Sequence, residues 1–308
     1  MFFFFMVCIR RHKNLQWFSI NLLTTYLSFD GRIKFKSSTV VRDEMHVMSR
    51  NYLNMFLYQQ PGFIFINCRI GAKGIPTKRA GAAAVAVGNK IVVLGGVSVT
   101  QKPLDSVEIY DVETNTWTAG ESMRESLLGI PAVVYEDQVL VTGGMSADGN
   151  PRNYFMSYNL KTNMWKSLPP MPTERYATFA FLIDNQLYIT GGRQGKLPVD
   201  AFEKYDFSSK TWEKLPNIPS KRVFALYASN NTHIFSVGGL KQKAEEGFSD
   251  TLECYDITEN AWIVGPSMPT KRGDFAIGMV DGKLVCAGGF ALIRGGIDSI
   301  HLSLSLDD

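Results

Sequence analysis

Histidine is scarce in this sequence, and its few copies stand apart from one another. The 308 residues include four histidines, His12, His46, His233 and His301. The sequence contains no HxH spacing of two histidines and no ExxH spacing of a glutamate and a histidine. Metal centres in proteins draw on such clusters. The glycine-rich phosphate loop and the GxSxG nucleophile turn are absent too. We therefore expect a protein that is not an enzyme, with no catalytic residue, no metal and no cofactor.

Cysteine is equally sparse and is spread over the chain. Cys8, Cys68, Cys254 and Cys286 form no CxxC pair. Scattered thiols in apolar strands are typical of small core residues in a reducing compartment rather than of a disulfide framework. The sequence thus favours a cytoplasmic location.

Neither a strong charge bias nor a long apolar run is present. The chain carries 32 basic and 29 acidic residues, a net charge of +3, which gives no reason to expect nucleic acid as a partner. Its apolar N-terminal stretch spans residues 1–9, far short of the roughly 20 residues that cross a bilayer. We expect no membrane partner either.

What the sequence does contain is a repeated phrase, in which an apolar strand, two glycines and a loop precede a tyrosine and, seven residues later, a tryptophan. The second glycines of successive copies lie 48, 48, 47 and 50 residues apart. Self-similarity at this period is typical of propellers and solenoids. The phrase occupies Gly95, Gly96, Tyr110 and Trp117; Gly143, Gly144, Tyr158 and Trp165; Gly191, Gly192, Tyr205 and Trp212; Gly238, Gly239, Tyr255 and Trp262; and a last pair, Gly288 and Gly289.

Each copy of the phrase reads as four short strands, named A to D in chain order. Strand B ends at the glycines, strand C carries the tyrosine, strand D carries the tryptophan, and Gly, Asn and Asp mark the turns. Four strands per unit predict an all-β propeller of four-stranded blades over residues 76–308. The rings fill the wedge between blades, and the glycines serve where the chain is crowded. The five recognisable units are 76–122, 123–170, 171–217, 218–267 and 268–308.

The last unit is shorter than the others. Asp298 aligns with the start of its strand C and Ser303 with the tyrosine, so no residues remain for a strand D. We expect residues 63–70, which stand where strand D of a preceding unit would lie, to complete this blade. The rest of residues 1–75 lacks the phrase, and a degenerate repeat or a loosely ordered extension would fit it.

The phrase resembles the kelch repeat, and the resemblance covers residues 76–308. Several strings are similar to the kelch domain-containing protein 8 group. The resemblance implies a propeller made almost solely of kelch repeats, without BTB or BACK domains, although members of that group carry more repeats. Some kelch propellers are copper oxidases with clustered His and Tyr ligands, which the isolated histidines here disfavour. The similar strings are Ser122-Met123-Arg124-Glu125, residues 170–176, Gly191-Gly192-Arg193-Gln194 and residues 215–219.

The antiparallel strands place the B–C and D–A loops on one face of the propeller, which we call the B–C/D–A face. These loops vary in length and are rich in basic residues, as suits a recognition surface. We predict that this face binds an acidic segment of a protein partner. A solvated loop surface without special affinity is the alternative. The candidate partner-binding residues are Arg152, Arg193, Lys196, Lys241, Lys243 and Arg294.

An arginine recurs 17 residues before the second glycine, and a glutamate recurs two residues before the tyrosine. The second unit has Leu127 and Met156 instead, so both charges are missing together. This joint loss favours buried Arg–Glu pairs within blades over a ligand-binding role, which such arginines have in some kelch propellers. In the last unit His301 takes the glutamate position. The residues concerned are Arg79 and Glu108, Arg175 and Glu203, Arg222 and Glu253, and Arg272.

Together these patterns predict a non-catalytic interaction scaffold or adaptor that binds a partner through the B–C/D–A face. One alternative is the substrate-recognition subunit of a ubiquitin ligase, disfavoured because no BTB-like domain precedes the repeats. A kelch-type enzyme or metal protein is the alternative from another class.

Overall fold

The computed structural model describes residues 73–242, 246–280, 282–293, 296–299 and 303–306, together with three strands nearer the N-terminus. Its elements are strands joined by turns and loops, as expected for an all-β protein. No helix in this part of the chain has the length and apolar character needed to span a membrane.

Four antiparallel sheets of four strands each form the first four blades, and in each the sheet order follows the chain order. The strands of the first two blades are β5 (Ala83–Val87), β6 (Lys90–Leu94), β8 (Val107–Asp111) and β9 (Thr116–Gly120), then β10 (Ala132–Tyr135), β11 (Gln138–Thr142), β12 (Phe155–Asn159) and β13 (Met164–Ser167). Those of the next two are β14 (Phe179–Ile183), β15 (Gln186–Thr190), β18 (Phe202–Asp206) and β19 (Thr211–Lys214), then β21 (Leu226–Ser229), β22 (His233–Val237), β24 (Leu252–Asp256) and β25 (Ala261–Val264).

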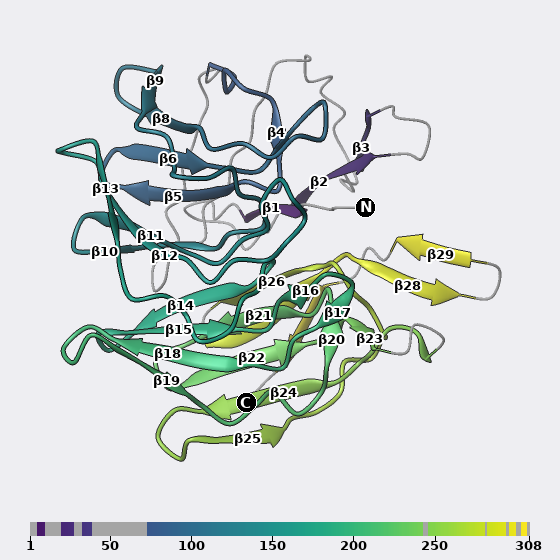
Figure 1. Cartoon of the computed structure of the whole chain (residues 1–308). Helices are drawn as coiled ribbons and strands as arrows, with labels where there is room; N and C mark the ends of the chain where they lie inside the picture. Colours follow the sequence, from purple (N-terminus) through teal and green to yellow (C-terminus); the bar gives the residue numbers. More distant parts are fainter. Residues whose placement is uncertain are drawn as a thin grey trace, which may run out of the picture.

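The A strands lie on the inside of this arrangement, where β10 contacts both β5 and β14, and β21 contacts β26 of the fifth blade. Figure 1 shows them near the centre, whereas the outer strands β9 and β25 lie at opposite margins of the molecule. The architecture is therefore that of the predicted β-propeller.

The fifth blade has three strands in the described part of the chain: β26 (Ala276–Val280), β27 (Lys283–Ala287) and β30 (Ser303–Leu306). Its third strand pairs Leu306 with Leu284, five residues before the second glycine. In the first blade the residue five before the second glycine, Ile91, pairs with the tyrosine of the phrase. Leu306 therefore holds the tyrosine position, and the prediction that Ser303 does so is wrong.

The error has a structural cause, an extra hairpin between the second and third strands of the fifth blade. The hairpin pairs β28 (Phe290–Ile293) with β29 (Gly296–Ser299). Asp298, expected to begin strand C, lies instead in β29 opposite Ala291. The inserted hairpin lengthens the B–C connection and moves strand C three residues later along the chain.

No strand of the described residues follows β30 at the outer edge of the fifth blade, and residues 63–70, predicted to supply one, lie outside the described residues. The tryptophans of the repeated phrase mark the place that follows a strand D, because each donates a hydrogen bond to the backbone there. Trp165 Nε1 donates to the carbonyl oxygen of Glu121, directly after strand D of the preceding blade, at 2.8 Å. Trp117 Nε1 donates in the same way to Lys73, at 2.7 Å. Lys73 thus occupies the place that follows a strand D.

Three strands from the segment before residue 76 form a separate antiparallel sheet: β1 (Phe5–Ile9), β2 (Ile20–Leu27) and β3 (Ile33–Ser38). Within it β1 pairs with β2, and β2 pairs with β3. Strand β1 contacts β26, so this sheet lies beside the fifth blade.

Three small two-stranded ladders of the described residues lie on the B–C/D–A face. They join β4 (Arg79–Ala80) to β7 (Val97–Ser98), β16 (Arg193–Gln194) to β17 (Leu197–Pro198), and β20 (Arg222–Val223) to β23 (Leu240–Lys241). In Figure 1 the ladders β16–β17 and β20–β23 lie together at one end of the blades, opposite the turn between β24 and β25. The loops of the third and fourth blades therefore meet on this face.

Apolar residues of neighbouring blades pack against one another, so the core is divided into wedges. One cluster joins Val92 of the first blade to Val139 of the second, and another joins Phe181 of the third to Ile234 of the fourth. In the first four blades the tyrosine and tryptophan rings of the phrase pack against each other in tilted pairs, with centroids 4.9–5.3 Å apart. These rings build the wedges, as predicted.

An asparagine that the phrase did not include holds three of the four tyrosines. Tyr110 donates from its hydroxyl to Asn115 Oδ1 at 2.7 Å, and Tyr158 donates to Asn163 Oδ1 at 2.6 Å. The same bond links Tyr255 to Asn260 at 2.5 Å. These asparagines adopt a left-handed backbone in the C–D turn, which Asn tolerates better than most residues.

The double glycine ties the first, second and fourth blades to the blade that follows. Gly144 donates its N–H to the carbonyl oxygen of Arg175 in the following blade, at 3.0 Å. A Cβ on Gly143, whose φ is +60°, would overlap that same carbonyl oxygen. Glycine is required here because the next blade's backbone occupies the space of a side chain.

Gly143→Ala should therefore destabilise the protein by more than the ~1–3 kcal/mol that a left-handed non-glycine residue costs by itself. Gly149→Ala is the matched control, since Gly149 also has positive φ (+82°) but a Cβ added to it would meet no atom within 4 Å. Urea unfolding of both variants measures the difference. Equal losses would show that backbone strain alone, and not the contact between blades, requires the glycine.

Candidate functional site

A buried ion pair lies inside three of the blades, at the positions where the sequence predicted Arg–Glu pairs. Arg175 Nη2 lies 2.8 Å from Glu203 Oε2, and the two side chains are 0% and 1% exposed. The other two pairs are Arg79 with Glu108, at 2.9 Å, and Arg222 with Glu253, at 2.6 Å. The side chains of these three arginines are therefore buried and paired within their blades.

Each buried arginine also binds backbone carbonyl groups of its own blade. Arg175 Nη1 donates to the carbonyl oxygens of Gly191 and Ala201, and its Nη2 donates to that of Ile189. Burial lowers the pKa of Arg175, and the neighbouring Glu203 opposes that effect. The pair is stabilised because hydrogen bonds satisfy most of the guanidinium, the condition under which a buried charge is tolerated.

A hydroxyl two residues before the arginine completes the cluster. Thr173 Oγ1 donates to Glu203 Oε1 at 2.5 Å, and Thr77 Oγ1 donates to Glu108 Oε1 at 2.6 Å. The fourth and fifth units also carry a hydroxyl residue at this position. In the second unit, however, the position is Glu125.

The second blade exchanges the polar and apolar positions of this cluster. Leu127 and Met156, 0% and 5% exposed, replace the arginine and the glutamate and join the core between the first two blades. An ion pair forms at the surface instead, with Arg152 Nη2 2.8 Å from Glu125 Oε1. Glu125 thus stands where the other units have a hydroxyl, and it binds Arg152 of the B–C loop.

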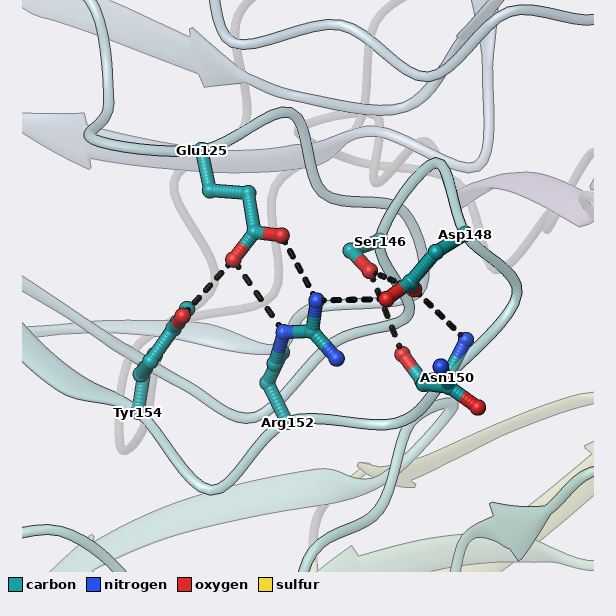
Figure 2. A network of polar contacts seen from close by, with 6 residues as sticks. All are labelled: Glu125, Ser146, Asp148, Asn150, Arg152 and Tyr154. Carbon is teal, nitrogen blue, oxygen red and sulfur yellow. Dashed lines mark hydrogen bonds and ion pairs between the residues drawn. The ribbon is translucent and has the colours of Figure 1, made fainter.

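Figure 2 shows how this surface network orders the B–C loop of the second blade. Arg152 also pairs with Asp148, at 2.9 Å, and Tyr154 donates from its hydroxyl to Glu125 Oε2 at 2.7 Å. Asp148 accepts further bonds from the Ser146 hydroxyl and from the backbone N–H of Asn150. The hydrogen bond from Arg152 is the chief cause that holds the pKa of Glu125 below its ordinary value.

The fifth blade differs from the prediction at the glutamate position. The strand register places Leu304 opposite Cys286, as Glu108 lies opposite Val93 in the first blade. Leu304, and not the predicted His301, therefore holds the glutamate position, because the hairpin β28–β29 shifts strand C. Arg272 is fully buried and donates to the Gly288 carbonyl oxygen at 3.0 Å.

The six basic residues predicted to bind a partner have unequal surroundings. Arg152 is neutralised by Glu125 and Asp148, so it is a poor site for a further carboxylate. Lys241 lies 3.4 Å from Glu246, and Lys196 is exposed. Lys243 and Arg294 lie outside the described residues.

Arg193 is the basic residue that stands out from the repeat. Its guanidinium carbon lies 5.8 Å from the ring centre of Tyr176 and 5.4 Å from that of Phe224, a distance typical of cation–π contact. No carboxylate of the described residues pairs with it. The other four units carry apolar residues directly after the second glycine: Val97, Met145, Leu240 and Phe290.

Phe224 belongs to an inner ring of residues that lie two positions after the arginine of each unit, or after Leu127 in the second unit. Gly129 donates its N–H to the Gly81 carbonyl oxygen at 3.3 Å, Ala177 donates to Gly129 at 2.7 Å, and Asp274 donates to Phe224 at 3.3 Å. All five have positive φ, between 53° and 65°. Two of them are glycines and one is alanine, so Phe224 and Asp274 are the large side chains of the ring.

Asp274 is the acidic member of this inner ring. Its Oδ2 atom is buried and has no hydrogen-bond partner. Burial raises the pKa of this carboxyl group to about 7. An unpaired buried carboxylate is costly, so the group holds its proton over most of the acidic range.

The histidine of the described part is held by hydrogen bonds at the start of a strand, and its two cysteines are buried. His233 begins strand β22 of the fourth blade, with Nδ1 2.7 Å from Thr232 Oγ1 and Nε2 3.5 Å from Asp256 Oδ2. Cys254 and Cys286 are buried, and burial raises the pKa values of their thiols to about 11 and about 12. The described residues contain no group of three or more His, Cys, Asp or Glu side chains placed to hold a metal ion.

The sheets, the inner ring and the loop face define a β-propeller of the kelch type. The Attractin/LZTR1 beta-propeller family model matches residues 49–303, and the chain belongs to this family. The match begins upstream of residue 76, where the repeated phrase begins.

Kelch domain-containing protein 8B is similar to part of the chain. The rat and human proteins are each 38% identical over 106 residues, which make up 32% of this chain and 30% of the relative. The alignment therefore spans less than a third of the relatives' length. The solved structure of YjhT has a TM-score of 0.62, with 15% identity, over 94% of this chain and 90% of its own, and it shares the fold.

A double-mutant cycle tests the buried pair. Glu203→Met alone should cost about 3–5 kcal/mol, because it leaves the Arg175 charge buried and unpaired. Arg175→Leu with Glu203→Met, which copies the second blade, should cost less than the sum of the two single changes. Urea unfolding measures each variant, with Glu174→Met at an exposed neighbouring position as the control. Strictly additive losses would contradict the coupling.

Asp274 predicts a pH dependence of stability. Its pKa in the folded state, about 7, lies above its ordinary value of 3.8. The unfolded chain therefore releases this proton first, and the free energy of unfolding falls as the pH rises from about 4 to about 7. The free energy of unfolding of Asp274→Asn, relative to that of wild type, should therefore rise by up to about 4 kcal/mol across this pH range. Equal differences between the two proteins at pH 5 and pH 8 would contradict the shift.

Proposed function

We propose that this chain is a non-catalytic interaction scaffold or adaptor that holds an acidic segment of a protein partner on its B–C/D–A face. The observation that carries the proposal is Arg193, a cation at a position that is apolar in the other four units. Its charge is not balanced by a carboxylate of the described residues, and two aromatic rings hold the guanidinium. A cation that is oriented in advance loses less entropy on binding an anion.

The surroundings of Arg193 also suit an apolar neighbour in the bound segment. Phe224 is 37% exposed and Leu197 is 60% exposed, and both belong to the loops that meet beside Arg193. Aromatic and arginine side chains together are typical of residues that dominate binding energy at protein interfaces. The proposed ligand therefore places a carboxylate on Arg193 and an apolar side chain against Phe224 and Leu197, with Lys196 nearby at the exposed tip of the loop.

The structure also limits the proposal to this part of the face. Arg152, predicted as a second anchor, is already bound by Glu125 and Asp148, so we assign it to ordering its loop. We also propose a cytoplasmic location, and the buried thiols of Cys254 and Cys286 support it because free cysteines persist in reducing compartments.

Charge reversal at the anchor tests the proposal. Fluorescence anisotropy would follow a labelled pool of peptides that each carry Glu or Asp beside Leu, Ile or Phe. Arg193→Glu should weaken binding at least about tenfold, which corresponds to ~1.4 kcal/mol, without lowering the melting temperature.

Lys210→Glu provides the matched control, since this exposed lysine lies in a C–D turn on the opposite face of the blades. It should leave binding unchanged. Equal affinity of wild type and Arg193→Glu for the peptides that bind would contradict the role of Arg193. A failure of every acidic peptide to bind wild type would contradict the function itself.

A further inference from the structure

The outer strand of the fourth blade differs from the outer strands of the first three blades. Two residues directly after each phrase tryptophan are exposed in all four blades. In the fourth blade they are Ile263 and Val264, which are 54% and 75% exposed. The corresponding residues are Thr118 and Ala119 in the first blade, Lys166 and Ser167 in the second, and Glu213 and Lys214 in the third. Among these four blades, the fourth alone thus presents two β-branched apolar side chains here.

The backbone of this strand is also unpaired on one side. Strand β25 is the last strand of its sheet, and no strand of the described residues pairs with its outer edge. Edge strands expose N–H and C=O groups that can pair with another strand, and proteins usually protect them with charged side chains. Lys166 in β13 and Lys214 in β19 provide such charges, whereas β25 has none.

One hydrogen bond determines which backbone groups of β25 point outward. Gly265 donates its N–H to the Leu252 carbonyl oxygen of β24 at 2.9 Å, and Val264 is opposite Glu253 in the register. Because the direction alternates along an antiparallel strand, the N–H and C=O groups of Trp262 and Val264 point away from β24. The outer edge therefore offers two donors and two acceptors.

These groups match a second copy of the same strand. In an antiparallel pair about a two-fold axis through position 263, Trp262 of each copy exchanges both backbone bonds with Val264 of the other. The two Ile263 side chains then face each other at the position where antiparallel strands approach most closely. Asn260 falls opposite Pro266, so no like charges meet at the flanks, and proline ends the pairing.

We propose that β25 is a self-association edge, through which two copies of this chain pair antiparallel to extend the fourth blade into a continuous sheet. The symmetry is that of an isologous dimer, in which one patch serves both partners. Four residues from each copy bury far less than the ~1,200–2,000 Å² of stable interfaces, so the dimer forms reversibly at high protein concentration. Figure 1 places β25 at the margin of the molecule, where a second propeller has room to approach.

Sedimentation velocity of the full chain from ~1 to ~200 µM tests the proposal, a range in which a weak dimer reveals itself by mass action. The wild-type protein should shift from monomer towards dimer as its concentration rises. Ile263→Lys, which copies Lys166 of the second blade, should remain monomeric, because two like charges would lie directly opposite each other. Its melting temperature should equal that of wild type, since the side chain is exposed.

Met164→Lys is the matched control, because Met164 is 64% exposed and lies on the outer strand β13. This variant should associate as wild type does. Hydrogen exchange supplies a second measure: the amides of Trp262 and Val264 should gain protection with concentration. Those of Trp165 and Ser167, which point outward from β13 in the same way, should not. A monomeric wild type over the whole range, or association that persists in Ile263→Lys, would overturn the proposal.

Discussion

One hydrogen bond recurs at three junctions between the described blades of the propeller, from the second glycine of a blade to the carbonyl group at the arginine position of the next. Gly96 donates to Leu127, Gly144 to Arg175 and Gly239 to Arg272, at 2.8–3.0 Å. The bond needs a residue without a side chain, and the glycine pair provides it. Where a blade has the arginine, the guanidinium donates to the carbonyl oxygen of the first glycine of that same blade. Backbone pairing between blades and the buried ion pair within a blade therefore meet at one point.

The second blade shows that the bond between blades does not need the ion pair. Leu127 accepts the bond from Gly96 as the arginines do, although its side chain is apolar. Replacing both charges by apolar residues of similar size removes the desolvation cost and the electrostatic gain together, and such exchanges are often tolerated. Glu125 and Arg152 restore one ion pair at the surface, where it orders a loop instead of filling the core.

The sequence predicted much of this fold because the repeat supplies its own alignment. The joint loss of Arg and Glu in the second unit was enough to predict the pairs found in the other blades. The register of the fifth blade was mispredicted because nothing in the phrase marks the hairpin β28–β29, and loops tolerate insertions. The pairing of Arg152 escaped notice, although Glu125 in place of the usual Thr or Ser was the available signal. The contact of Phe224 with Arg193 could not be predicted, since a left-handed phenylalanine has no local sequence signature.

The buried pairs have a consequence for how the blades find their register during folding. Side chains alternate between the two faces of a strand, so a slip of one residue in β18 would turn Glu203 to the opposite face of the third blade. The guanidinium of Arg175 would then stand alone in an apolar wedge, and the slipped sheet would be strongly penalised. Each buried pair thus favours the correct strand register of its blade over a slipped one. The second blade has no such pair in its interior, although Glu125 and Arg152 still form an ion pair across its loops.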